Sequence, residues 1–403
     1  MSVKRVLLHF GMPKAGSTSI QHTLSNNTAL LEKNNIKYLT EWGVNHLNIF
    51  HNLFSPCPVS PKASGHLGKP HANVKQKNKK NIEKMLKAIN TANCETLILS
   101  GEFFHELYLD STLDNINTFL NKYFHSKGIE TTIIYFIRNP LTWLISFLQQ
   151  RVSHDGYMNK NDDFFQFRIK QYEGIFNLKK HFPDSLLLLS FEDACLDKDG
   201  LVGFFLKKIG FPENEIKELN IYRMNESKCM ELMEFIYYIE SVEPRYPYKN
   251  YKHFGANRSS NDLKVLKTIT GSKFDLAHSS KLSLWKRLWE TVLLLKENIG
   301  IDYTNYDIPP PCIQKTYSEE TIEGFIKVFP KLNYVLQKHF LRFFEMKYME
   351  TADVKFKQLF DNDSIPYTIF TKKIALFYLP SLRIKNRVLE IIPHQMKKSM
   401  KWL

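Results

Sequence analysis

The chain has 403 residues, of which 43% are hydrophobic, enough for a substantial core in one large domain or two smaller ones. The formal net charge of +14 indicates anionic partners or an anionic surface. The five cysteines are scattered without a C-x-x-C pair. This pattern indicates neither a disulfide framework nor a zinc site, and we expect buried, reduced thiols and no metal site.

The chain enters its first predicted strand at about Arg5, which leaves no room for a signal peptide. No apolar run approaches the roughly 18 residues that a membrane span needs. We therefore expect a soluble cytoplasmic protein.

A glycine-rich turn follows the first apolar run. The run Val6–Phe10 suits a strand buried on both faces of a parallel sheet, and Gly11 ends it. Gly16 permits close approach of the backbone to a ligand. The hydroxyl residues that follow, Ser17, Thr18 and Ser19, offer N-cap oxygens to a helix. Amides at a helix N-terminus, these hydroxyls and the Lys14 ammonium together favour an anion site.

The order of residues in this turn differs from that of a Walker A loop. Gly11 and Gly16 keep the Walker A spacing, but Lys14 lies between them and Ser17 occupies the lysine position. The sequence from Pro13 to Ser19 resembles instead the 5′-phosphosulfate loop of sulfotransferases that use 3′-phosphoadenosine 5′-phosphosulfate (PAPS). The resemblance implies a fold similar to that of P-loop kinases and a loop, including Ala15, that holds the 5′-phosphate without a metal.

Strands and helices alternate along the first half of the chain. Further strands are predicted over residues 36–39, 96–100, 131–137 and 185–191, and helices over residues 73–90, 140–150, 163–181 and 201–209. This alternation predicts an α/β fold with a parallel sheet of about five strands flanked by helices. The fold class is thus P-loop-NTPase-like, with a largely helical C-terminal extension.

A second cofactor motif begins where the predicted strand 131–137 ends. Arg138 stands at the end of the strand, Asn139 is a good N-cap, and Pro140 suits the first helical turn. In sulfotransferases the pattern R-x-P-x-x-x-x-x-S holds the 3′-phosphate, and Arg138 and Ser146 match both functional positions. A weaker resemblance, to an R-x-N-x-S segment near the cofactor, covers Arg223, Asn225 and Ser227.

Sulfuryl transfer needs a base and a group that neutralises charge on the leaving oxygen. Lys14 is placed in the loop to stabilise that oxygen. Glu102 directly follows the predicted strand 96–100, and carbohydrate sulfotransferases use a glutamate as base. His105 is the local competitor, because the small-molecule branch generally uses a histidine.

Acceptor recognition is expected from loops beside the cofactor. The candidates are Trp42, His46, Gln150 and Arg151. The lysine-rich segment Lys62–Lys80 would suit an acidic acceptor, although a solvated charge run explains it equally well.

Three domains are predicted: a PAPS-binding core over residues 1–230, a helical acceptor-side region over 231–365 and a basic amphipathic tail over 366–403. The tail either contacts an anionic membrane surface from the cytoplasmic side or packs on the domain.

The resemblance implies a PAPS-dependent sulfotransferase that sulfates a hydroxyl of a carbohydrate, such as a capsular polysaccharide or its precursor, and releases the 3′-phosphoadenosine 5′-phosphate (PAP). The alternatives are a small-molecule sulfotransferase, a P-loop-like kinase, and a non-catalytic polyanion-binding protein. The charge pattern lacks the features of common nucleic-acid folds, so no nucleic-acid partner is expected.

Overall fold

The structure is a computed structural model that describes residues 3–56, 74–103, 107–154, 164–223, 228–242, 260–310 and 316–357. The chain divides into two compact units. Unit 1 comprises Met1–Trp143, Asp163–Glu226 and Leu288–Tyr306, and unit 2 comprises Leu144–Asp162, Ser227–Arg287 and Asp307–Leu403. The end of the second unit 1 segment lies close to the predicted boundary at 230. The sequence did not predict that Leu288–Tyr306, which follows a unit 2 segment, belongs to unit 1. The predicted tail 366–403 lies outside the described residues.

Unit 1 contains a five-stranded sheet with the order β2-β3-β1-β4-β5. The strands are β1 (Arg5–Phe10), β2 (Ile36–Tyr38), β3 (Thr96–Gly101), β4 (Glu130–Ile137) and β5 (Leu186–Ser190). Every neighbouring pair is parallel; in the central strand Leu8 pairs with Leu99 on one side and Ile133 on the other. The predicted parallel sheet is therefore confirmed, and its carboxyl ends meet at one edge.

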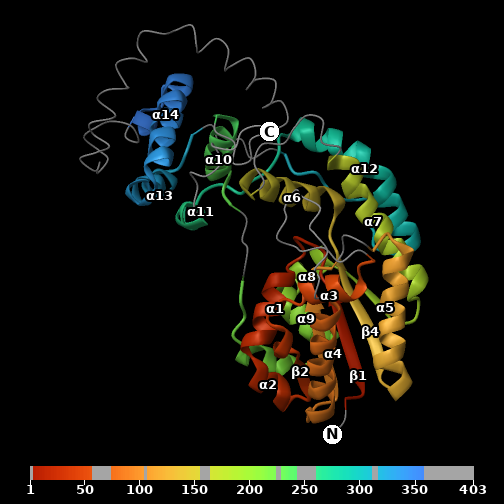
Figure 1. The fold of residues 1–403 in the computed structure, drawn as a ribbon. Helices are drawn as coiled ribbons and strands as arrows, with labels where there is room; N and C mark the ends of the chain where they lie inside the picture. Colours follow the sequence, from red (N-terminus) through yellow and green to blue (C-terminus); the bar gives the residue numbers. More distant parts are fainter. Residues whose placement is uncertain are drawn as a thin grey trace. The chain divides into compact units, whose positions relative to one another are not determined.

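Helices cover both faces of this sheet (Figure 1). They are α1 (Ser17–Asn26), α2 (Thr28–Lys33), α3 (Leu47–Phe54), α4 (Val74–Thr91), α5 (Asp110–Tyr123), α7 (Phe164–His181), α8 (Phe191–Leu196) and α9 (Gly200–Lys208), with the start of α6 (Pro140–His154). Neighbouring residues of a strand point to opposite faces. The His9 ring lies 5.3 Å from Phe205 of α9, whereas the Phe10 ring lies 5.3 Å from Phe50 of α3. These two helices therefore cover opposite faces of β1.

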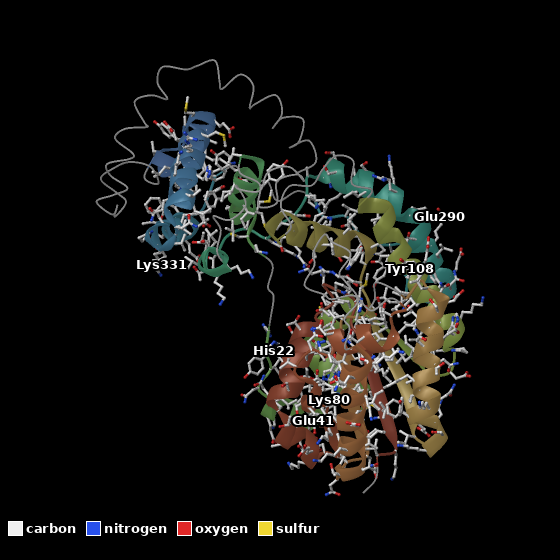
Figure 2. All side chains as sticks on the ribbon, viewed as in Figure 1. His22, Glu41, Lys80, Tyr108, Glu290 and Lys331 are labelled. Atoms are coloured by element: carbon white, nitrogen blue, oxygen red, sulfur yellow. The ribbon has the colours of Figure 1, made fainter. Side chains whose placement is uncertain are left out.

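The outer face of α4 is strongly basic. Met85, Ala88 and Ile89 bury one side of the helix, and the exposed lysines of the other side include Lys80 (Figure 2). Hydrogen bonds hold α4 against neighbouring segments. The indole of Trp42 donates to the carbonyl of Asn81 at 3.0 Å, and the side-chain amide of Asn78 donates to the carbonyl of Asn52 at 2.7 Å.

Unit 2 is helical in its described part, as predicted for the C-terminal extension. Its helices are α10 (Met230–Val242), α11 (Ser260–Leu266), α13 (Glu319–Val328), α14 (Tyr334–Thr351) and α15 (Val354–Lys357), with most of α6 and the first half of α12 (His278–Ile299). A cluster of buried aromatic rings holds α10, α13 and α14 together, with Phe235, Phe325 and Phe344 at its centre. In the part of the chain that the structure describes, no helix combines the length and the apolar character needed to cross a membrane.

Candidate active site

The turn between β1 and α1 lies at the carboxyl edge of the sheet. The amide of Gly11 donates to the carbonyl of Gly101 at 3.0 Å, which ties the turn to the end of β3. Lys14 and Gly16 adopt left-handed φ angles of 65° and 76°. For a lysine this conformation costs roughly 1–2 kcal/mol, so the surrounding contacts must impose it. Strain of this kind occurs preferentially at ligand-binding sites.

The hydroxyls of this turn do not cap α1, contrary to the prediction. The N-cap is Gly16, and no side chain caps the helix, because the chain is already helical at Ser17. The Ser17 hydroxyl is buried and has no hydrogen-bond partner in the part of the chain that the structure describes. A Cβ atom on Gly11 would lie 1.9 Å from this oxygen, so only glycine fits beneath it. A buried unpaired hydroxyl costs about 1–3 kcal/mol, and an anion oxygen held by the helix N-terminus would supply a partner for it.

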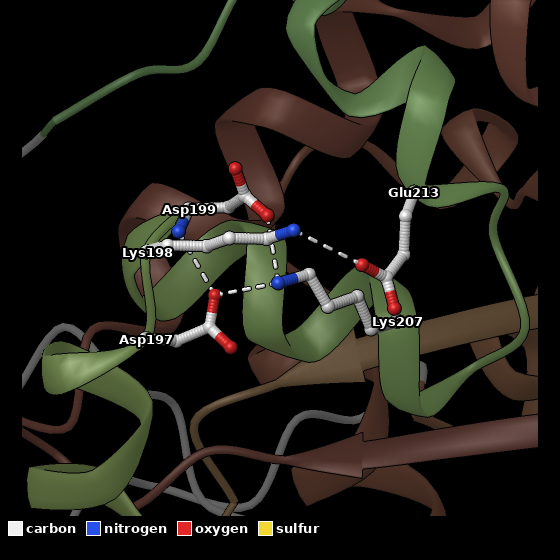
Figure 3. A network of polar contacts seen from close by, with 5 residues as sticks. All are labelled: Asp197, Lys198, Asp199, Lys207 and Glu213. Atoms are coloured by element: carbon white, nitrogen blue, oxygen red, sulfur yellow. Dashed lines mark hydrogen bonds and ion pairs between the residues drawn. The ribbon is translucent and has the colours of Figure 1, made fainter.

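The α8–α9 turn supports the loop from the side. A Cβ atom on Gly16 would lie 1.9 Å from a methyl group of Leu201, so α9 packs directly against the loop backbone. The turn before Leu201 is fixed by Lys207, whose ammonium pairs with Asp197 and Asp199, each at 2.7 Å (Figure 3). The hydrogen bond from Lys207 lowers the pKa of Asp197.

The structure brings the end of β4 against the Gly11–Ser19 loop. The guanidinium Nη1 of Arg138 donates to the carbonyl of Lys14 at 2.5 Å, and the indole of Trp143 donates to the carbonyl of Pro13 at 2.8 Å. Asn139 caps α6 as predicted, since its side-chain oxygen accepts from the amide of Leu141 at 2.9 Å. The two predicted cofactor segments are therefore adjacent within unit 1.

Arg138 is half-buried and lies in an organised polar setting. Its guanidinium stacks over the ring of Phe191 at 4.8 Å, and its Nε donates to the Thr142 hydroxyl at 3.1 Å. Burial lowers the pKa of Arg138, while the carboxylate of Glu192 opposes this shift. Because an arginine stays charged even with a lowered pKa, the site keeps a fixed cation at the end of β4.

Glu102 directly follows β3, beside the loop. Its carboxylate accepts from the Thr18 hydroxyl at 3.4 Å, a long contact. Burial raises the pKa of Glu102, and the Lys14 ammonium and the Thr18 hydroxyl act in the opposite direction. Glu102, the predicted base, is therefore close enough to feel the charge of Lys14, the residue predicted to stabilise the leaving oxygen. His105, the competing base, lies outside the described residues.

The remaining predicted cofactor residues are Ser146, Arg223, Asn225 and Ser227. Ser146 is half-buried on the unit 2 portion of α6, and Arg223 is exposed at the end of a described segment of unit 1. Asn225 and Ser227 lie outside the described residues. The predicted partnership of Ser146 with Arg138 stays a prediction.

Two of the four predicted acceptor residues belong to the core of unit 1, which corrects their assignment. His46 is fully buried: its Nδ1 accepts from the amide of Ser100 at 3.0 Å, and its ring stacks on Tyr38. Trp42 is 7% exposed, and its indole hydrogen is used in the contact with α4. Both side chains are therefore buried in unit 1 and not presented to solvent. Gln150 lies on α6 in unit 2, and the side chain of Arg151 lies outside the described ones.

Sequence reasoning missed Glu192 and Tyr303. The Glu192 carboxylate, just after β5, accepts hydrogen bonds from the amide of Asn139 and from the hydroxyls of Thr142 and Tyr303. A carboxylate at a strand end could have been found by the rule that selected Glu102. No local pattern singles out Tyr303.

Among the described residues, no group of three or more histidine, cysteine, aspartate or glutamate side chains is arranged to hold a metal ion. The described cysteines Cys94, Cys195 and Cys229 are free thiols.

No family model matches the chain, and no curated protein matches it. Among solved structures, a sulfotransferase from Alicyclobacillus acidocaldarius is 11% identical over 61% of this chain and 95% of its own, with a TM-score of 0.36. The sulfotransferase domain of the curacin biosynthetic pathway is 12% identical over 83% of this chain and 99% of its own, with a TM-score of 0.32.

A third similar structure is retinol dehydratase in complex with androsterone and the inactive cofactor PAP. It is 14% identical over 76% of this chain and 84% of its own, with a TM-score of 0.32. All three TM-scores lie below 0.5.

Proposed function

We propose that this protein is a PAPS-dependent sulfotransferase that transfers the sulfuryl group to a hydroxyl of a carbohydrate, a surface or capsular polysaccharide or its precursor. The observation that carries the proposal is the junction of two segments more than a hundred residues apart, where Arg138 donates to the backbone of Lys14. The sequence motifs at these two segments are the ones that sulfotransferases use for the two phosphate ends of PAPS.

The loop would hold the 5′-phosphosulfate. Its donors are the Lys14 ammonium, the amides of Gly16, Ser17 and Thr18, and the buried Ser17 hydroxyl, which has no hydrogen-bond partner among the described residues. Arg138, with Ser146 two turns along α6, would hold the 3′-phosphate. The cofactor supplies the sulfuryl group, and the protein supplies fixed donors around its charges. Arg223, Asn225 and Ser227 stay proposed as further contacts.

The chemistry would use Glu102, which follows β3, and Lys14, which lies in the Gly11–Ser19 loop after β1. Glu102 takes the proton from the acceptor hydroxyl, and its raised pKa makes it a stronger base than an exposed glutamate. Lys14 neutralises the charge that develops on the bridging oxygen as the nucleotide leaves. His105 is the alternative base.

The charge of α4 supports an acidic acceptor. Lys77, Lys80, Lys84 and Lys87 are exposed and recur at the spacing of one helix face. No described carboxylate forms an ion pair with any of the four. No aromatic side chain stands on the helix to stack on a nucleobase, so recognition there would depend on charge alone. We further propose Gln150 and Arg151 as acceptor contacts, and a peripheral contact of residues 366–403 with an anionic membrane.

A transfer assay tests this function. The purified chain is incubated with PAPS labelled in the sulfuryl group and with neutral and acidic polysaccharides, and label in the polymer is counted. We expect incorporation into an acidic polysaccharide without added metal, and incorporation at least a hundredfold slower with Glu102→Gln, about the contribution of a general base. Glu95→Gln, at the opposite end of β3 in an exposed ion pair with Lys4, is the matched control and should retain activity. Absence of transfer to every acceptor, with PAP failing to bind, would overturn the proposal.

A further inference from the structure

We propose that Glu192 and Tyr303 are positioning residues for Arg138, and that through Arg138 they set the shape of the Gly11–Ser19 loop. The proposal rests on the proposed function only for the identity of the ligand. Hydrogen bonds join four residues in series, Arg138, Thr142, Glu192 and Tyr303, and this series is the Arg138–Tyr303 chain.

The direction of each hydrogen bond in the Arg138–Tyr303 chain follows from chemistry. A guanidinium can only donate, and a carboxylate can only accept. The Thr142 hydroxyl lies 3.1 Å from Arg138 Nε and 3.1 Å from Glu192 Oε1, so it accepts from the first and donates to the second. The carbonyl of Asn139, at 3.2 Å, competes for the same hydrogen, but a charged acceptor forms the stronger bond.

Glu192 also holds the first turn of α6. The amide of Asn139 donates to both carboxylate oxygens at 3.1 Å. A negative charge is favourable at this end of a helix because the macrodipole is positive there. The carboxylate therefore fixes both the residue after Arg138 and the hydroxyl that receives Arg138 Nε.

Tyr303 fixes Glu192 in turn. Its hydroxyl lies 2.9 Å from Glu192 Oε2 and 3.1 Å from the carbonyl of Ile137, the last residue of β4. Burial raises the pKa of Tyr303, so the phenol stays a hydrogen-bond donor across the working pH range. This tyrosine comes from the last segment of unit 1, Leu288–Tyr306, which follows a long unit 2 segment in the sequence.

The other end of the Arg138–Tyr303 chain reaches the loop. Arg138 Nη1 donates to the carbonyl of Lys14, the residue with the unfavourable φ of 65°. Loss of Glu192 would free the Thr142 hydroxyl and the Asn139 amide, and Arg138 could then leave this orientation. We therefore expect the loop to become more mobile and the anion site weaker, although none of Thr142, Glu192 and Tyr303 belongs to the loop.

The test compares Thr142→Val, Glu192→Gln and Tyr303→Phe with a matched control, Glu215→Gln. Glu215 accepts from Asn34 at 2.9 Å and from Lys33 at 3.3 Å near the start of β2, at the opposite edge of the sheet. Amide hydrogen exchange is measured for residues 11–16 and 138–143. We expect faster exchange in both segments in the three variants and unchanged exchange there in the control.

Titration calorimetry with PAP gives the second readout. We expect Glu192→Gln to weaken binding roughly tenfold, about the effect of one charge-assisted hydrogen bond, with a smaller effect of Tyr303→Phe. When the PAPS concentration is varied, the KM for PAPS should rise by a larger factor than the factor by which kcat falls. Because Glu192 acts through Arg138, adding Glu192→Gln to Arg138→Ala should weaken binding no further.

The two proposals fail in different ways. If the unmodified protein does not bind PAP, the proposed function is wrong, and the exchange data still decide the positioning role. If Glu192→Gln leaves exchange of residues 11–16 and PAP affinity unchanged, or if its effect adds fully to that of Arg138→Ala, the positioning role is wrong even for an active sulfotransferase.

Discussion

The carboxyl ends of β3 and β5 each carry a glutamate near the Gly11–Ser19 loop, and the two environments differ. Glu102, after β3, accepts one long hydrogen bond at 3.4 Å. Glu192, after β5, accepts from an amide and two hydroxyls at 2.9–3.1 Å. Burial raises the pKa of Glu102 because few donors compensate for the lost water.

The two carboxylates differ in how many hydrogen bonds they accept, and this difference agrees with the proposed role of Glu102 as a base and of Glu192 as a positioning residue. A carboxylate with free lone pairs can take a proton from a substrate, whereas one whose oxygens are already satisfied cannot do so without breaking those bonds. The same position in the fold, a strand end, would therefore serve chemistry at β3 and support at β5, as we propose.

The largest expected effect is on catalysis at the β3 end. Glu102→Gln removes the base and keeps the shape, so kcat should fall by about 10²–10⁴-fold, the usual contribution of a general base. PAP affinity should stay close to that of the unmodified protein, in contrast to Glu192→Gln. A Glu102→Gln protein with full activity would exclude this residue as the base.

The pH dependence sharpens the distinction. Glu102 acts as a base only when ionised, so activity should be lost as pH falls through its raised pKa, above the ordinary value near 4.5. The Thr18 hydroxyl lowers this pKa, so Thr18→Val should raise it and move the acidic limb of the kcat profile to higher pH. Glu192→Gln should leave the position of that limb unchanged. A limb that does not move in Thr18→Val would contradict the assignment.

A smaller effect is expected on the acceptor. The triple variant Lys77→Gln, Lys80→Gln and Lys84→Gln removes three exposed charges from α4 and should raise KM for an acidic polysaccharide several-fold at low salt. The difference should shrink as salt is added, and the affinity for PAP should not change. Equal KM values at low salt would show that the face of α4 is only solvated.

The smallest effect concerns stability of the α8–α9 turn. Lys207→Met should lower the midpoint of urea unfolding slightly, because the ammonium joins Asp197 and Asp199. Asp197 has a lowered pKa in the folded protein, so this stabilisation is present above the ordinary aspartate pKa and is lost as pH falls through the lowered value. Lys217→Met, an exposed lysine of the same unit, is the control. A pH-independent difference would contradict the ion-pair origin.

Local patterns sufficed for much of the fold and part of the site. The strand and helix periodicities predicted the parallel sheet, and the Arg138-Asn139-Pro140 order predicted the helix start that Asn139 caps. The sequence could not show that Trp42 and His46 turn into the core, because this depends on how α3 packs against the sheet. Local patterns could not predict the contact of Tyr303 with Glu192 either, because the two residues are 111 positions apart in the sequence.

One nucleotide is proposed to bridge the Gly11–Ser19 loop and Arg138, and titration calorimetry with PAP and with ATP tests this bridging most directly. Without magnesium, we expect PAP to bind with a Kd on the order of micromolar and ATP to bind far more weakly. Lys14→Ala and Arg138→Ala should each weaken PAP binding while the circular dichroism spectrum stays unchanged. Binding of ATP in preference to PAP, or full PAP affinity in both variants, would contradict the account.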